Sequence, residues 1–495
     1  MKEKMRHFWS WGPGPAMYTA GAAALLFLCL VPLLRLADFS VPWYDDYNYG
    51  RYVRDALVST PGVEGAFLGA FACIKMSWYA WQGTYGSIFF MALMPGVFGE
   101  SFYKWGPVFL IFLLCIAVSA LVYNGLRALQ IPERLPCLGF AFLAAAMAEL
   151  LIYTAREGFY WYNGGVHYVG MHSFGMLFAA AALRTLATEK TKERIGFGLA
   201  AALLALPTAG GNLVTTLQGL LVILMFLALG VLGKKKSTFF LLPAGIVYLA
   251  GFYMNVTAPG NAVRAVSYDG WGMPPMKAIA YSFLEAIRFA PTFTGWGTLV
   301  FLALALPLAG YLVRRTKFSF PLPVLVSFFS FCFYATGFTP SLYSMGHAGL
   351  SRTLNAVKIT WQLMLWLNLI YWCGYLVHRG KKEEAANGRI CHWWRIPVLG
   401  LCACVIFAAE PNRAGTFSSY GAYHYVHSGE ANNFYQEYLD RVNRIKEGGD
   451  VVEVPAYHWK PWFLYMGDLS EDPQEESNRA LAAWYDKDQI ICITD

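Results

Sequence analysis

Residues 16–50 read AMYTAGAAALLFLCLVPLLRLADFSVPWYDDYNYG, and this stretch decides the fold class. From about Ala16 to Ala37 it is apolar, and a helix needs about 20 apolar residues to cross a bilayer core about 30 Å thick. The run is too long for the core of a signal peptide, and no convincing cleavage site follows it. We therefore expect a helix that stays in the membrane, followed at once by a polar and aromatic loop.

The rest of the chain repeats this pattern of apolar runs and polar breaks. Of its 495 residues, 57% are apolar and only 14% are charged, whereas a soluble domain carries about 25% charged residues. Further runs begin near Trp105, Pro136, His167, Gly196, Leu213, Thr238, Gly297, Pro321, Ala356 and Ile396. The sequence therefore predicts an all-α polytopic membrane protein with about eleven transmembrane helices.

The basic residues lie in short clusters between the apolar runs, which disfavours a nucleic-acid surface and indicates an orientation. The clusters fall at residues 2–6, 127–134, 184–194, 234–236, 314–317 and 379–395. Alternating spans place all of these clusters on one side, and cytoplasmic loops are enriched in Lys and Arg. We therefore expect a multi-pass protein of the cell membrane with a cytoplasmic N-terminus and an extracytoplasmic C-terminus.

Two regions follow from the same pattern. Residues 1–410 form a transmembrane domain, and its first outer loop, residues 38–104, contains apolar segments broken by Gly and Pro. We expect these segments to be interfacial or re-entrant helices. Residues 411–495 are polar and predict a short extracytoplasmic C-terminal segment that packs on the outer loops.

Asp45 and Asp46 directly follow the first span, at the predicted outer surface. One interpretation is structural, because Asp is a favoured N-cap and a helix starting near Tyr47 would use one. The other is functional, because adjacent carboxylates can bind a divalent cation such as Mg²⁺ or Mn²⁺, or one can act as a general base. Both can hold, with one Asp capping the helix and the other taking part in chemistry.

Polar side chains in the outer loops form a candidate substrate-binding set. Its members are Gln82, Tyr85, Arg156, Glu157, Tyr162, Asn163, His167, Asn212 and Asn261. Each also has a structural interpretation. The aromatic residues and Arg156 could belong to an interfacial belt, and Asn212 could satisfy a broken backbone between two spans.

A second candidate set is cationic. Arg264 follows a Pro-Gly-Asn turn, and His347, Arg352 and Lys358 lie close together where a span begins. Such a group suits the phosphate of a lipid head group, although a solvated loop is the commoner place for any single arginine. Lys358 lies slightly inside the predicted span, where a solvated position is harder to maintain.

Several other chemistries lack their sequence motifs. The chain has no Walker A motif, no H-E-x-x-H, no G-x-S-x-G and no G-x-G-x-x-G after a strand. These absences disfavour an ATP-driven pump, a zinc protease, an α/β-hydrolase and a dehydrogenase.

The order and spacing of five segments resemble the GT-C class of glycosyltransferases, and more narrowly a family of bacterial polytopic membrane proteins assigned to that class. The segments are WYDDYNYG (43–50), WQGTYGS (81–87), YWYNGGVHY (160–168), APGNAVR (258–264) and GDLSEDPQEESNRALAAWYDKDQI (467–490). The resemblance covers the whole chain, including HSGEANNFYQEYLDR at 427–441. It implies a GT-C-like fold in a bacterial plasma membrane.

The resemblance also implies an inverting transferase that moves a hexosyl or pentosyl group from a polyprenyl-phosphate donor to a cell-surface or lipid-linked glycan. Asp45 or Asp46 would be the general base, and a divalent cation on this pair is the metal that the class allows. Arg264, His347 and Arg352 would neutralise the departing phosphate, with Lys358 beside them.

Two alternatives remain open at this point. A flippase or transporter for lipid-linked sugars should carry polar residues through the middle of its spans. A glycan polymerase would work on the same outer face as the transferase. For the transferase, the expected partners are the bilayer, a polyprenyl-phosphate sugar donor and a glycan or lipid-linked acceptor, and no nucleic acid.

Overall fold

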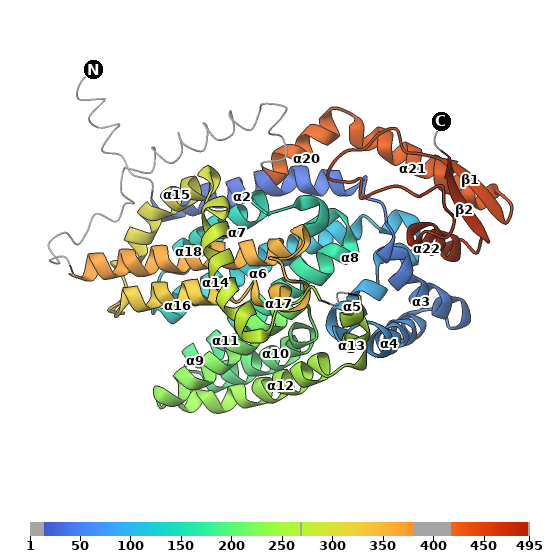
Figure 1. Ribbon diagram of the computed structural model, residues 1–495. Coiled ribbons are helices and arrows are strands. Elements are labelled where there is room, and N and C mark those ends of the chain that lie inside the picture. Colours follow the sequence, from blue (N-terminus) through green and yellow to red (C-terminus); the bar gives the residue numbers. More distant parts are fainter. Residues whose placement is uncertain (1–13, 268–269, 380–416, 494–495) are drawn as a thin grey trace, which may run out of the picture.

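The structure is a computed structural model, and it describes residues 14–267, 270–379 and 417–493. Long helices form a bundle in which most run side by side (Figure 1). The bundle helices are α2 (Pro15–Ala37), α6 (Trp105–Ala128), α7 (Arg134–Leu150), α9 (Met171–Ala187), α10 (Thr191–Ala209), α11 (Leu213–Leu232), α12 (Leu242–Val256), α15 (Trp296–Val313), α16 (Pro323–Ala335) and α18 (Ser351–Arg379). Leu33 and Leu36 of α2 and Leu110 and Leu114 of α6 are fully buried between them.

Seven stretches of the described chain are long and apolar enough to cross a membrane. They are Pro15–Ala37, Glu100–Ala128, Tyr162–Ala187, Leu213–Leu232, Lys236–Val256, Trp296–Val313 and Pro323–Met345. Helices α7, α10 and α18 also lie where spans were predicted, but they do not reach the same combination of length and hydropathy. The span predicted from Ile396 and the domain boundary at 410 lie outside the described residues. The chain is thus a mostly helical membrane protein.

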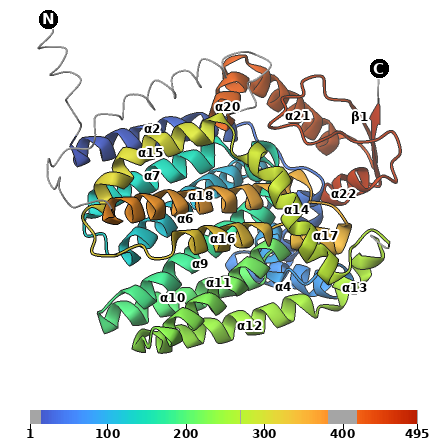
Figure 2. The same cartoon turned by 60° about the vertical axis from the view of Figure 1, so that its left-hand side comes forward.

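Successive bundle helices alternate in direction, so their connections gather at two ends (Figures 1 and 2). At one end, Thr316 after α15 donates a hydrogen bond to the carbonyl of Leu129 after α6, at 2.6 Å. Arg315 pairs there with Glu133 at 3.1 Å. The turns at this end carry basic clusters of the sequence. We call the opposite end, where α3 begins, the Asp45 end.

The first loop folds into three helices, α3 (Asp45–Ser59), α4 (Val63–Ala80) and α5 (Tyr85–Ala92), followed by the 3₁₀ turns η1 (Pro95–Phe98) and η2 (Glu100–Phe102). Helix α4 packs closely on α3 because Gly69 has no side chain, and a Cβ there would collide with the carbonyl of Tyr52. None of α3, α4 and α5 is a candidate span by length and hydropathy, and their interfacial location stays a prediction.

Shorter elements connect the other bundle helices. The π-helical turns η3 (Arg156–Tyr160) and η4 (Val166–Gly170) flank α8 (Tyr162–Gly165), and such turns are frequent at functional sites. The remaining connections contain η5 (Lys236–Leu241), α13 (Pro259–Val266), α14 (Pro275–Phe293) and α17 (Thr339–Met345).

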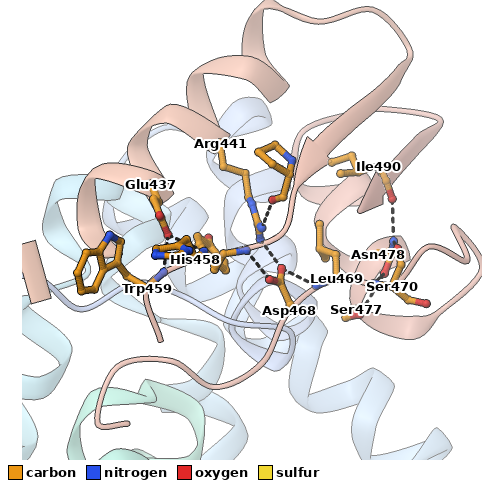
Figure 3. Close-up of polar contacts among 12 residues, drawn as sticks. Glu437, Arg441, His458, Trp459, Asp468, Leu469, Ser470, Ser477, Asn478 and Ile490 are labelled. Atoms are coloured by element: carbon orange, nitrogen blue, oxygen red, sulfur yellow. Dashed lines mark hydrogen bonds and ion pairs between the residues drawn. The ribbon is translucent and has the colours of Figure 1, made fainter. Parts of the chain in front are cut away.

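The C-terminal segment contains α20 (Ser418–His427), α21 (Glu430–Glu447), β1 (Val451–Pro455), α22 (Glu476–Trp484) and β2 (Gln489–Ile493). The two strands pair in parallel, and this small sheet was not predicted. Arg441 donates to Asp468 at 2.8 Å, and Asp468 also accepts from the backbone N–H of Leu469 at 2.9 Å (Figure 3). These bonds fix the long connection between the strands.

The C-terminal segment packs on the first loop, as predicted from its polarity. Helix α22 lies against α3 (Figure 1). The Tyr485 hydroxyl donates to Glu100 at 3.0 Å, and Lys446 pairs with the same carboxylate at 2.9 Å. Arg54 of α3 donates to the carbonyl of Trp484 at the end of α22.

Candidate functional site

Asp46 is fully buried and ties α3 to two other parts of the chain. Its Oδ2 atom accepts hydrogen bonds from the backbone N–H of Trp43 at 2.9 Å and from the Tyr103 hydroxyl at 2.8 Å. Its Oδ1 atom accepts from the backbone N–H of Asn163 at 3.0 Å. Burial raises the pKa of Asp46 to about 7, and these three donors oppose the rise. Both oxygen atoms are therefore occupied by the protein itself.

Asp45 is half-buried, and within the described residues its carboxylate has no hydrogen-bond or ion-pair partner. Burial raises the pKa of Asp45 to about 6; Arg352 and Arg264 oppose the rise, and Glu476 adds to it. A carboxylate with free oxygen atoms and a pKa near the working pH is suited to act as a general base.

Two arginines from distant helices act on Asp45. Arg264 of α13 donates to the side-chain oxygen of Gln82 and lies over the Trp81 ring, 5.5 Å from its centroid. Arg352, in the first turn of α18, lies 5.3 Å from the centroid of the Trp161 ring. Aromatic faces hold guanidinium groups without neutralising them.

The charge of these arginines is only partly compensated. The Arg352 Nη1 atom lies 3.8 Å from Oε1 of Glu157, whose other oxygen accepts a hydrogen bond from Ser351. Arg264 has no ion-pair partner in the part of the chain that the structure describes. Arg264 therefore keeps a guanidinium charge that no carboxylate of the described residues pairs with, as the binding of an anion such as a phosphate requires.

Three buried side chains of the 161–167 segment carry polar atoms that lack a hydrogen-bond partner in the described structure. They are Nε1 of Trp161, both amide atoms of Asn163 and Nδ1 of His167. Asn163 is 1% exposed and His167 9%, and both arginines act electrostatically on His167. Leaving a buried polar group unpaired costs about 1–3 kcal/mol, so these atoms are suited to meet hydroxyl groups of a ligand.

Other predicted substrate-binding residues have structural partners. Asn212 caps α11 and donates to the carbonyl of His167 at 2.7 Å. Asn261 accepts from the backbone N–H of Gly83 at 3.0 Å and so holds α13 against the loop before α5. The structural interpretation of Asn212 as a group that satisfies broken backbone is therefore the one that its contacts support.

Two predicted aromatic residues pack away from Asp45. The Tyr162 hydroxyl donates to the carbonyl of Phe90 at 3.1 Å. The Tyr85 ring lies against Gly210 and Gly251, at each of which a Cβ would collide with it. Both rings therefore serve the packing of the first loop on the bundle.

Arg156 holds the C-terminal segment. Its Nη2 atom donates to the carbonyl of Met466 at 2.7 Å, and its guanidinium group lies 4.4 Å from the centroid of the Trp462 ring. These contacts use the donors that were predicted to bind substrate.

Two predicted phosphate-binding residues are not joined to Asp45 by any contact among the described residues. His347 is exposed in the turn before α18, where its Nδ1 atom accepts from the backbone N–H of Gly349 at 3.1 Å. Lys358 is half-buried further along α18, without a hydrogen-bond or ion-pair partner in the described chain. Arg264 and Arg352 make no hydrogen bond or ion pair with the Asp45 carboxylate in the described chain either, but both lower its pKa, and His347 and Lys358 are not among the groups that do.

The donors at Asp45 do not suit a divalent cation. Among the described residues, no group of three or more His, Cys, Asp or Glu side chains comes together. A dication beside Asp45 would also meet the charges of Arg264 and Arg352. The residues around Asp45 therefore do not fit Mg²⁺ or Mn²⁺.

Two residues of the site were missed from sequence. Tyr103 supports Asp46 from the far end of the first loop, and Glu476 reaches the site from the C-terminal segment. Tyr103 follows an apolar, Gly-broken stretch, and no spacing links it to Asp46. Glu476 lies in the polar tail, among several other acidic residues.

Comparison with known proteins identified no relative of this chain. No protein-family model, no curated protein and no solved structure matches the chain significantly. The arrangement of residues at the Asp45 end is therefore the basis for assigning a function.

Proposed function

We propose that this chain is a GT-C-type glycosyltransferase that moves a sugar from a polyprenyl-phosphate donor to a glycan acceptor on the outer face of the membrane. The observation that carries the proposal is the environment of Asp45. Its carboxylate has no partner among the described residues, has a pKa of about 6, and is acted on by two arginines whose charge is only partly compensated.

Asp45 is the general base in this proposal, and Asp46 is its structural support. The acceptor hydroxyl oxygen attacks C1 of the donor sugar from the side opposite the phosphate, and its proton passes to Asp45. The bond between C1 and the phosphate oxygen breaks, and the electron pair leaves with the polyprenyl phosphate. The configuration at C1 is inverted.

Arg264 and Arg352 stabilise the departing phosphate. The negative charge on the leaving oxygen grows as the C1–O bond breaks, so cations fixed near it lower the barrier. Both guanidinium groups are held by aromatic rings and polar side chains rather than by full ion pairs. They are therefore in place before the charge develops.

Asn163, His167 and the Trp161 indole N–H form the sugar-binding edge. Their unpaired polar atoms come from one short segment next to Arg352 and Asp46. Hydroxyl groups of a sugar ring both donate and accept hydrogen bonds, as this mixture of donors and acceptors requires.

The outer face is proposed from the distribution of basic residues. The clusters at 127–134, 234–236 and 314–317 belong to turns at the end of the bundle opposite Asp45. Cytoplasmic loops attract such clusters, so Asp45, Arg264 and Arg352 are assigned to the extracytoplasmic side.

The test uses the full-length chain in lipid nanodiscs with a panel of radiolabelled polyprenyl-phosphate hexoses and pentoses and isolated cell-envelope glycan. We expect transfer to the glycan with release of polyprenyl phosphate, and we expect the Asp45→Asn variant to lose at least about 100-fold in rate because it has no base.

The matched control is Asp55→Asn, which removes a carboxylate from an exposed position of the same helix and should leave the rate unchanged. Full activity of a folded Asp45→Asn variant would refute the base assignment. Translocation of labelled lipid by proteoliposomes, without sugar transfer, would instead identify a transporter.

A further inference from the structure

The backbone immediately before Asp45 is strained. Tyr44 has φ of 35° and ψ of −87°, although it is not glycine. A side chain with a Cβ rarely adopts positive φ, and such conformations persist only where the surroundings enforce them. This backbone conformation turns the chain between Trp43 and the start of α3, and it therefore also sets the position of the Asp45 backbone.

The C-terminal segment supplies contacts that enforce this corner. The Tyr44 hydroxyl donates a hydrogen bond to the carboxylate of Glu476, in the first turn of α22. The preceding loop approaches Trp43 closely at Gly467, where a Cβ would sit 2.9 Å from the indole ring. Asp46 also accepts from the backbone N–H of Trp43, so Trp43 is held both by α3 and by the C-terminal segment.

We propose that the C-terminal segment is part of the catalytic site, and that Glu476 is a positioning residue that holds Tyr44 and thereby sets the position of Asp45. The inference rests on the proposed function and deepens it, because it assigns the segment a role in the transfer step. Glu476 reaches Asp45 through Tyr44 and through its charge, and it does not contact the substrate.

Glu476 has an electrostatic effect that can be measured. The charged and titratable groups around Asp45 come from α3, α13, α18 and α22 and are Tyr44, Asp46, Tyr49, Arg264, Arg352, Glu476 and Arg479. Among them, Glu476 is the carboxylate that reaches the site from the C-terminal segment. Its negative charge raises the pKa of Asp45, so removing the charge should lower that pKa.

Two variants separate the charge from the hydrogen bond. Glu476→Gln removes the charge but keeps an oxygen that can accept from Tyr44, whereas Tyr44→Phe removes the hydrogen bond and keeps the charge. We expect Glu476→Gln to move the acidic limb of the kcat/KM profile to lower pH by roughly 0.3 to 0.7 unit, with kcat at high pH retained.

Tyr44→Phe should give the complementary result. The acidic limb stays in place, while kcat falls by about 3- to 10-fold with the KM for the donor unchanged, because the base is less well placed. The control is Glu475→Gln, which removes the same charge one residue earlier and should change neither quantity. If Glu476 served only packing, its substitution would not shift the acidic limb of the kcat/KM profile. An unshifted limb in Glu476→Gln, together with an unchanged kcat in Tyr44→Phe, would therefore overturn the proposal.

A second readout needs no substrate. The pKa of Asp45 is raised from 3.8 to about 6 in the folded state, so the stability of the native chain relative to Asp45→Asn falls as pH rises across that interval. The difference in melting temperature between the two proteins therefore titrates Asp45. The same comparison is then made between the Glu476→Gln variant and the Glu476→Gln/Asp45→Asn double variant. There the difference in melting temperature should fall at a lower pH.

The two readouts distinguish the possible failures. Absence of transfer by the native chain with every donor would refute the proposed function, and the melting-temperature titration would still decide whether Glu476 acts on Asp45. Sugar transfer that requires Asp45 but is unchanged in both Glu476→Gln and Tyr44→Phe would support the proposed function and refute the role of the C-terminal segment.

Discussion

Asp45 and Asp46 are adjacent in the chain but have opposite surroundings. Asp46 receives three hydrogen bonds at full burial, whereas Asp45 receives none from the described residues and is instead acted on by Arg264 and Arg352. The sequence predicted an N-cap, a base or both for this pair, and the cap prediction is wrong: α3 begins at Asp45 itself, and Tyr44 occupies the N-cap position. The sequence could not divide the roles, because the donors to Asp46 come from Tyr103 and Asn163, far along the chain.

This division predicts that the two Asp→Asn variants fail differently. Asp46→Asn replaces one oxygen acceptor by a donor that faces N–H and O–H donors, and each hydrogen bond to a charged group contributes about 1.5–3 kcal/mol. We expect a clear fall in melting temperature and loss of folded protein in detergent, measured by thermal unfolding and size exclusion. Asp45→Asn should remain fully folded, and equal losses in both variants would contradict the assignment.

At the scale of elements, the helices formed by long apolar runs could be predicted from the sequence. The runs expected from Ala16, Trp105 and Leu213 became α2, α6 and α11, because a long apolar run forms a helix almost independently of its neighbours. The parallel pair β1 and β2 was not foreseen, since its five-residue strands are joined by a connection that contains α22. Buried and more exposed residues alternate along both strands, but five residues are too few to identify the pairing partner of either strand.

The connection before α22 depends on Arg156 for its position. We expect Arg156→Ala to release the loop around Met466 and Trp462, because it removes both the 2.7 Å hydrogen bond and the stacked guanidinium group. Limited proteolysis should then cleave the C-terminal segment several-fold faster, followed by mass spectrometry of the fragments. Arg51→Ala, which removes a cation from α3, is the control, and equal cleavage in both variants would exclude an anchoring role for Arg156.

At the scale of the whole molecule, the site is assembled from parts that are distant in the sequence. Tyr44 and Glu476 are 432 residues apart, and Arg264 and Gln82 are 182 residues apart. Sequence placed most of these residues on one side of the membrane, because alternating spans determine sides. It could not determine which residues act on one another, so Arg264 and Arg352 were grouped with His347 and Lys358, which are not among the charges that act on Asp45.

The proposed orientation can be checked in intact cells. The Gly449→Cys variant changes an exposed residue of the C-terminal segment, and Lys235→Cys changes an exposed residue at the opposite end of the bundle. A membrane-impermeant maleimide should label the first variant in intact cells and the second only after permeabilisation. The unsubstituted chain gives the background from native cysteines, and the reverse pattern would place Asp45 on the cytoplasmic side.

The docking of α22 on α3 has a consequence for biogenesis. Residues 43–46 leave the ribosome early, after the first apolar helix, whereas Glu476 and Gly467 emerge after the described bundle helices have been synthesised. A nascent chain can therefore insert its spans while the corner at Tyr44 still lacks these two contacts. Synthesis of the C-terminal segment would then be the event that completes the site, so that a growing chain contains Asp45 before that residue is held in its final geometry.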